Sequence, residues 1–127
     1  MFRQTNPNHK GLRVGDCAVR ALAIATDQSW SQAYWKLCLQ GDIDGDMPSS
    51  KSVWNSTLRN LGFRQWALPD ACPDCYTVRD FCRENQNGTY ILATGNHVVT
   101  VINGDYYDAW DSGDEVPVFV WRRENDA

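Results

Sequence analysis

The spacing of apolar and polar residues divides the chain into a first part with helical periodicity and a second part with strand periodicity. The clearest helical segment runs from residue 17 to 26, where every residue except Arg20 and the closing threonine is apolar. A helix that is apolar nearly all round is a buried one. Asp16, a residue type favoured at the N-cap, directly precedes it. We therefore predict a buried helix that begins at Cys17.

Three further helices are expected from capping residues and helical spacing. A capping box that begins at Ser29 predicts a second helix to about residue 40, ended by Gly41. The segment 41–50 is predicted to be a loop, and the next helix to start after Ser49 or Ser50 and end at Gly62. A second capping box at Thr77 predicts a short helix over 78–85.

Beyond residue 62 most of the chain has the period of two that is typical of strands. β-rich runs separated by turn sequences occur at residues 63–68, 89–94, 97–102, 105–110 and 116–122. The last four runs predict an antiparallel meander. Because helices come first and strands last, we predict one α+β domain over 1–127. It would comprise an irregular arm (1–15), a helical part (16–62) and a mainly β part (63–127).

Charge and hydropathy narrow the classes of partner. The chain has 12 Lys and Arg against 16 Asp and Glu, a net charge of −4 with no basic run. We therefore expect neither nucleic acid nor an anionic membrane as partner, since both require clustered positive charge. No apolar run resembles a signal peptide or a membrane span, so we expect a soluble, cytoplasmic protein. The oligomeric state stays open.

The five cysteines are an odd number, so at least one free thiol is expected. Cys17 occupies the start of the buried helix, where unpaired N–H groups and the positive end of the helix dipole favour a thiolate. The negative charge of Asp16 opposes this unless its carboxylate caps the helix. A small apolar filler is the simpler interpretation of a cysteine there. A nucleophilic role therefore requires a base nearby.

A histidine and an aspartate in the predicted hairpin could supply that base and its orienting group. The two-residue Asn-Gly turn after Ile102 sets the register and puts Asp108 diagonally across from His97. In an ideal register His97, Asp108 and Trp110 share one face with Val99, Val101 and Tyr106, whereas Asp111 points away. Taken alone, His97 would be interpreted as an ordinary strand histidine and Asp108 as a solvated residue at the edge of the sheet. Together with Cys17 they give a nucleophile, a base and an orienting carboxylate.

This arrangement resembles the papain-like cysteine peptidases. Asp108-Ala109-Trp110 is similar to the family's Asn-Ser-Trp, and the sequences around Cys17 and His97 look like a compact branch common among bacteriophage and bacterial proteins. The resemblance implies N-terminal helices packed on a C-terminal antiparallel sheet. It also implies a thiol peptidase or isopeptidase that cleaves a peptide or protein substrate without a metal or cofactor. Trp110 would shield the His97–Asp108 pair, with Asp16 and Asp111 as supporting residues.

Two positions depart from the papain pattern. The oxyanion glutamine, six residues before the nucleophile, is replaced by Gly11. The resemblance therefore requires another side-chain donor beside the Cys17 backbone N–H, and we expect Asn6, with Asn8 and Gln4 as alternatives. The third triad member is an aspartate, Asp108 or Asp111. Substrate selection is expected from the loops 41–50, 69–76 and 111–115.

Alternatives from other classes use the same residues. A catalytically idle papain-like module could bind and block a host factor, and an acyltransferase or cell-wall amidase could use the same triad. Cys72 and Cys75 have the spacing of a zinc or redox pair, but the chain offers too few further ligands for a typical zinc site. We expect the four cysteines other than Cys17 to be fillers. The acidic run 42–46 lacks the spacing of a calcium loop.

Overall fold

The computed structural model describes residues 1–69 and 71–124, which form a mixed α+β fold. The predicted β part, 63–127, ends in residues 125–127, which lie outside the described residues. The helices are α1 (Cys17–Ala25), α2 (Trp30–Asp44), α3 (Lys51–Asn60) and α4 (Val78–Glu84). The strands are β1 (Phe2–Gln4), β2 (Phe63–Ala67), β3 (Thr89–Ala93), β4 (Val98–Ile102), β5 (Asp105–Asp108) and β6 (Phe119–Arg123).

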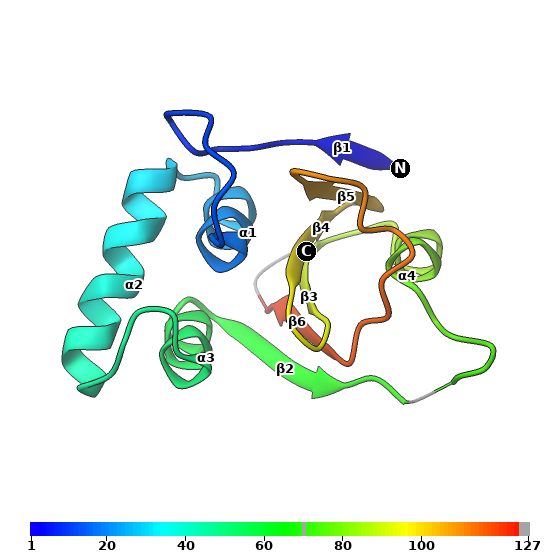
Figure 1. The fold of residues 1–127 in the computed structure, drawn as a ribbon. Coiled ribbons are helices and arrows are strands. Elements are labelled where there is room, and N and C mark those ends of the chain that lie inside the picture. Colours follow the sequence, from blue (N-terminus) through cyan, green and yellow to red (C-terminus); the bar gives the residue numbers. More distant parts are fainter. Residues whose placement is uncertain (70, 125–127) are drawn as a thin grey trace.

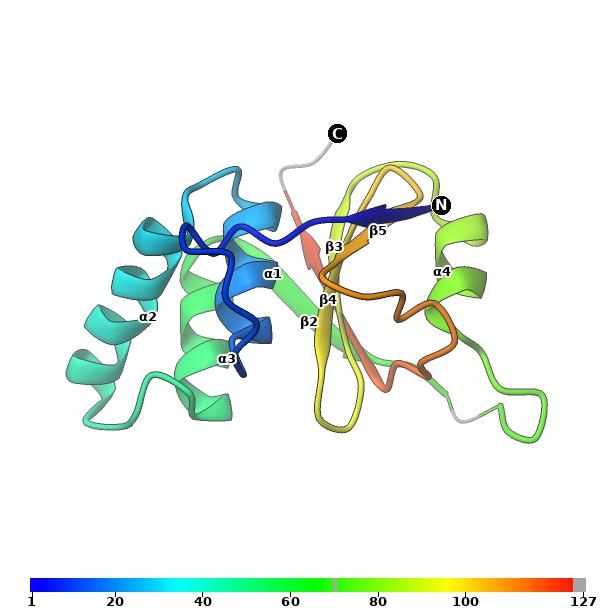
Figure 2. The same ribbon diagram turned by 45° about the horizontal axis from the view of Figure 1, so that its top comes forward.

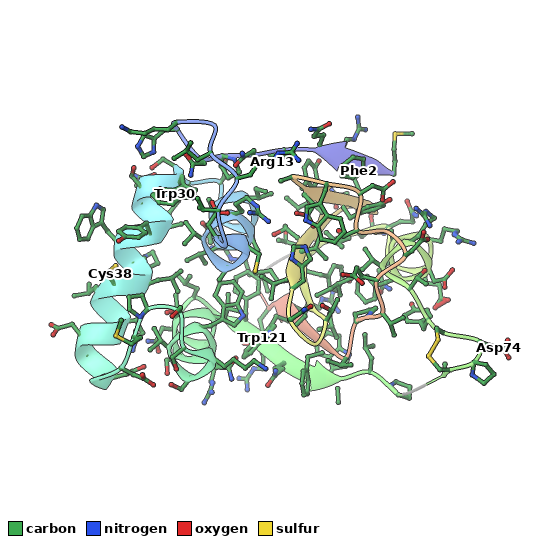
Figure 3. The ribbon with its side chains drawn as sticks, in the orientation of Figure 1. Phe2, Arg13, Trp30, Cys38, Asp74 and Trp121 are labelled. Carbon is green, nitrogen blue, oxygen red and sulfur yellow. A yellow bond between two sulfur atoms is a disulfide. The ribbon has the colours of Figure 1, made fainter. Side chains whose placement is uncertain are left out.

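Helices cover both faces of the sheet. Helices α1, α2 and α3 lie on one face and α4 lies on the other (Figures 1 and 2). Ile91 and Trp121 pack under the three-helix layer, and Figure 3 places Trp121 between those helices and the sheet. Val99, Val101 and Tyr106 pack with α4 on the opposite face. The Thr100 hydroxyl donates to the carbonyl of Ala21 (2.8 Å) and so ties α1 to β4.

The strands follow the order β1-β5-β4-β3-β6-β2, and the predicted meander is correct only for β3, β4 and β5. Strand β6 does not continue beside β5 but crosses over to pair with β3 and with β2. Val120 and Trp121 of β6 are almost fully buried on opposite faces. A strand that is apolar on both faces belongs in the interior of a sheet that is covered on both sides. The predicted position of the last strand was therefore wrong.

The place beside β5 is taken by β1, in a segment predicted to be irregular. Residues Phe2–Gln4 pair in parallel with β5. Three residues are too few to produce a recognisable alternation, and the pairing satisfies the backbone groups at the open edge of β5. The prediction of an irregular arm therefore holds for 5–15 and is wrong for 2–4.

Helix α2 is longer than predicted, because Gly41 lies inside it and does not end it. A Cβ at Gly41 would lie 2.7 Å from the carbonyl oxygen of Asp46, so this position requires glycine for close packing. The helix instead ends at Gly45, whose φ of 71° is left-handed. Residues 42–44 therefore belong to the helix and not to the predicted loop. None of the helices in the described part of the chain is long and apolar enough to cross a membrane.

Candidate active site

Cys17 is the first residue of α1, as predicted, but Asp16 does not cap the helix. The Asp16 side chain accepts no hydrogen bond from the first turn. The buried Asp16 carboxylate instead forms an ion pair with Arg20 and accepts from the indole N–H of Trp30 (2.8 Å). The backbone N–H groups at the start of α1 thus keep their hydrogen-bonding capacity beside the thiol. The expected cap is replaced by a buried charge pair.

His97 and Asp108 form a short hydrogen bond, with 2.6 Å between Nε2 and Oδ2. The hairpin register that pairs Ile102 with Asp105 is confirmed. Both side chains are largely buried, at 10% exposure for His97 and 2% for Asp108. Because Nε2 is engaged by Asp108, Nδ1 is the ring nitrogen available to Cys17, and Cys17 and His97 line the same hollows. The three candidate residues therefore lie together at one site.

The predicted common face of the hairpin is correct for His97 with Asp108 and Trp110, but it does not extend to Val99, Val101 and Tyr106. Val99, Val101 and Tyr106 pack on the α4 side, whereas His97 and Asp108 reach Cys17 and Arg20 of α1. The physical reason is that His97 precedes β4 and Asp108 is the last residue of β5. Side chains at the ends of strands are less constrained by the pleat than side chains inside a ladder.

Asp108, and not Asp111, is the carboxylate that faces the histidine. Asp108 also accepts from the Ser112 hydroxyl (2.7 Å) and from the backbone N–H of Ala109 (2.8 Å). Asp111 lies outside this network, where it accepts from the Tyr106 hydroxyl (2.5 Å). The multiple bonds hold the Asp108 carboxylate in one orientation. Ser112 was not among the predicted site residues.

Trp110 covers the imidazole, as predicted. The two ring centroids are 4.9 Å apart and the planes are tilted by 34°. Trp110 itself is 42% exposed, so its outer face meets solvent while the inner face lies against His97. An apolar ring over a His–carboxylate pair keeps water from competing for the hydrogen bond.

Arg20 is the main site residue that the sequence reasoning missed. Its guanidinium is buried, pairs with Asp16 and lies 3.4 Å from Asp108 Oδ1. It stands three residues after Cys17, a spacing that puts two side chains on one face of a helix. The available signal was its position as the single charged residue in an otherwise apolar helix. Arg20 supplies the positive charge that makes two buried carboxylates tolerable.

The electrostatics of the three residues favour an ion pair. Burial raises the pKa of Cys17, but hydrogen bonds from His97 and from the Val98 backbone, with the charges of His97 and Arg20, outweigh it and lower that pKa below its usual value. Burial also disfavours a charged His97, but its bonds to Asp108 and Cys17 raise its pKa to about 9. For Asp108, burial is outweighed by bonds from His97 and Ser112, so its pKa is lowered. The directions of these shifts favour a Cys17 thiolate beside a His97 imidazolium.

This ion pair predicts that Cys17 is alkylated by iodoacetamide at neutral pH faster than Cys38 or Cys82. The pKa of Cys82 is raised to about 11 by burial, so its thiol stays protonated. In His97→Ala the pKa of Cys17 should rise, because burial remains and the opposing hydrogen bond is lost. Mass-spectrometric rates across pH measure both effects. A Cys17 rate profile that His97→Ala leaves unchanged would contradict the ion pair.

Cys17 and His97 line two hollows that meet at the thiol. The first, about 430 Å³, lies between α1, the start of α3, the turn at 93–97 and β6, with Trp54 and Phe119 in its wall. The second, about 320 Å³, lies between the end of the arm, at Arg13, and Trp110. Among the described residues of the three loops expected to select substrate, only Ser49 of 41–50 contributes to a lining. The turn before β4 contributes more residues to the two linings than these loops do.

The predicted side-chain donors for an oxyanion lie away from these hollows. Asn6 donates its amide to the carbonyl of Leu12 (3.2 Å), Asn8 is buried in the same arm, and Gln4 belongs to β1. None of the three lines either hollow. Asn96, exposed and directly before His97, lines both and was missed. Asn6 therefore does not take the place of the oxyanion glutamine of the papain pattern in this arrangement.

The remaining cysteines include a bonded pair. Cys72 and Cys75 form a disulfide in the exposed loop beyond β2, beside Asp74 in Figure 3, so the expectation that both are fillers is wrong. The two-residue spacing brings their sulfurs together. Cys17, Cys38 and Cys82 are free, and Cys82 is buried as expected of a filler. Within the described ranges, no group of three or more His, Cys, Asp or Glu side chains could hold a metal.

Comparison of the chain with protein-family models, with curated proteins and with solved structures gave no match. Function is therefore inferred from the chemistry of Cys17, His97 and Asp108 and from the hollows beside them.

Proposed function

We propose that the protein is a thiol-dependent hydrolase, a papain-like cysteine peptidase or isopeptidase that cleaves a peptide-type amide in a peptide or protein. The observation that carries the proposal is the 2.6 Å bond between His97 Nε2 and Asp108 Oδ2 at a site where Cys17 and His97 line the same hollows. A nucleophile, a base and an orienting carboxylate in this order are the parts that amide hydrolysis by a thiol requires.

In the proposed reaction the Cys17 thiolate attacks the carbonyl carbon of the amide. The oxyanion that forms is bound by the backbone N–H of Cys17, which lacks a side-chain partner, and Asn96 is the amide side chain available as a second donor. The His97 imidazolium then gives its proton to the leaving amine, and the C–N bond breaks to leave a thioester on Cys17. His97 next removes a proton from water, which attacks the thioester and releases the acid.

The fold is consistent with this chemistry. Cys17 begins a buried helix packed on a sheet, and His97 and Asp108 lie at adjoining ends of two neighbouring strands. These are the positions that the resemblance to papain-like peptidases implies. The two hollows that meet at the thiol offer space for the chain on either side of the cleaved bond. They support a peptide substrate over a small acyl donor.

A peptide library derived from a bacterial lysate provides the direct test. We expect new termini that appear with the wild-type protein, analysed by mass spectrometry, and that do not appear when Cys17 has first been alkylated with iodoacetamide. Transfer of an acyl group to an added amine in place of water would instead favour the acyltransferase alternative. If no bond is cut and Cys17 reacts with the pH dependence of an ordinary free thiol, the protein is a binding module and the proposal is wrong.

A further inference from the structure

A third hollow adjoins the larger of the two hollows at Cys17. It measures about 480 Å³, lies between the end of α3, β2 and β6, and has no part in the proposed reaction. Gln65 and Trp121 line both this hollow and the 430 Å³ hollow at Cys17. Figure 3 shows Trp121 between the helices and the sheet. The two hollows are therefore neighbours on one side of the molecule, and we call them together the α3 groove.

A line of polar side chains on α3 runs along the α3 groove. Lys51, Asn55 and Arg59 are spaced four residues apart, which puts them on one side of the helix. Lys51 and Asn55 line the hollow at Cys17, and Arg59 lines the hollow beyond it. A helix rises about 1.5 Å per residue, so the line from Lys51 to Arg59 is about 12 Å long. This is the length of about four residues of an extended peptide.

The α3 groove has an excess of positive charge. His97 aside, the described residues that line it include three cations, Lys51, Arg59 and Arg64, and one carboxylate, Glu124. Glu124 pairs with Arg64, which leaves Lys51 and Arg59 exposed and without an ion pair among the described residues. The whole chain has a net charge of −4, so the groove departs locally from the overall charge of the protein.

Asp46 is the carboxylate closest to Lys51 in the sequence, but it does not neutralise this lysine. Its carboxylate accepts from the hydroxyls of Ser50 and Ser52, at 2.9 Å each, at the start of α3. Asp46 lines neither hollow of the groove. The positive charge of Lys51 is therefore available to a ligand in the hollow at Cys17.

The wall of the groove next to Cys17 is largely apolar. Val118 and Phe119 are each 42% exposed, and both line this hollow together with Trp54. Apolar side chains gathered in a concave site with a few polar groups are typical of a ligand-binding surface. An apolar side chain of a substrate would cover them.

We propose that the α3 groove binds the substrate peptide on one side of the cleaved bond and selects an apolar side chain at the thiol with acidic side chains further along, at Lys51 and Arg59. This inference rests on the proposed function, because the groove is a substrate site only if Cys17 is the nucleophile. A peptide fits the groove better than a small anion does. The two cations lie at opposite ends of a 12 Å line, about four residues of extended peptide apart, with the side-chain amides of Asn55 and Gln65 available to hydrogen-bond to a peptide backbone.

Cleavage of two matched peptides at low salt tests the charge selection. Both contain the bond identified from the peptide library, and they differ only in Glu or Lys at about two to six residues from it, on each side in turn. On one side we expect kcat/KM of the wild type to be at least about tenfold higher for the Glu peptide, with the ratio falling as salt is added. The net charge of −4 would by itself favour the Lys peptide, so overall charge cannot produce this result.

Two Lys→Glu variants, each on a helix, separate the groove from the rest of the surface. Lys51→Glu should lower the Glu-to-Lys ratio at least about threefold, because an attraction in the groove becomes a repulsion. Lys36→Glu makes the same change on α2, which contributes no lining residue to the groove, and should leave the ratio unchanged. A wild-type ratio near one, or an equal fall in both variants, overturns the proposal.

A binding measurement lets this proposal and the hydrolase proposal fail separately. Two dye-labelled pools of synthetic peptides, with Leu or Phe followed at varied spacing by Glu or by Lys, are added to Cys17→Ala, and anisotropy is recorded. We expect the Glu pool to bind about tenfold more tightly, and Lys51→Glu to reduce this difference. Equal binding overturns the groove inference even if peptides are cut. Selective binding of the Glu pool without any cleavage by the wild type would overturn the hydrolase and leave an acidic-peptide site.

Discussion

Peptide cleavage by the Cys17→Ala variant is expected to fall at least about 10⁴-fold, to the level of a protein without a nucleophile. The reason is that the thiolate forms the only covalent bond to the substrate in the proposed reaction, so His97 and Asp108 have nothing to activate once it is absent. Alanine is the strongest helix former, and Cys17 is only half-buried, so α1 should stay intact. Cleavage of the peptide identified from the library measures the loss, with circular dichroism to establish folding.

The other free thiols provide matched controls for this result. Cys38→Ala removes a half-buried cysteine of α2 and should leave the rate of cleavage at the wild-type level. Cys82→Ala removes a buried sulfur from the cluster beneath α4 and should cost stability but not turnover of the folded protein. Cleavage that survives in Cys17→Ala, or that disappears in Cys38→Ala, would remove Cys17 from the role of nucleophile.

Replacement of Arg20 with methionine is expected to reduce the free energy of unfolding by about 3–5 kcal/mol, because it leaves uncompensated charge in the interior. Methionine fills a similar volume and favours a helix, so the loss would come from charge and not from packing. Asp16 and Asp108 are both buried, and each pairs with the Arg20 guanidinium. Urea unfolding followed by Trp fluorescence measures the effect.

A double variant distinguishes the effect of charge on stability from the effect of side-chain shape. Asp16→Asn keeps an oxygen that can accept from the Trp30 indole and removes the carboxylate that has lost its cationic partner, since Asp108 keeps its bond to His97. Arg20→Met with Asp16→Asn should therefore be more stable than Arg20→Met alone. If the double variant is less stable than the single one, the carboxylate of Asp16 is not the source of the cost, and the charge argument for Arg20 is incorrect.

The local parts of the site could be predicted from the sequence because local rules decide them. An apolar run after Asp16 determines that a buried helix begins at Cys17. A two-residue Asn-Gly turn determines which residue of the second strand reaches His97, and the short bond to Asp108 follows from it. Each inference needed only periodicity or turn geometry over fewer than about 20 residues.

The parts that could not be predicted depend on contacts between distant segments. Strand β6 moves beside β3 because the sheet is covered on both faces, and no property of 119–123 alone indicates which neighbour it will have. The ion pair of Arg20 with Asp16 is local, but the approach of Arg20 to Asp108 depends on the position of β5. Gly41 resembles a helix stop until the close approach of Asp46 gives it a packing role. A sequence pattern identifies such a residue but does not indicate which distant residue it will contact.

The bond between Asp108 and Nε2 of His97 also restricts the route of the proton. With Nε2 held in a hydrogen bond of 2.6 Å, a ring flip would have to break that bond inside a largely buried pair. In the proposed reaction His97 would then receive and return its proton through Nδ1, on the side of the ring that faces Cys17. The departing amine would approach the same nitrogen that the thiol used. Bond formation and leaving-group departure would thus share one edge of the imidazole, which would set the direction in which a substrate chain crosses the thiol.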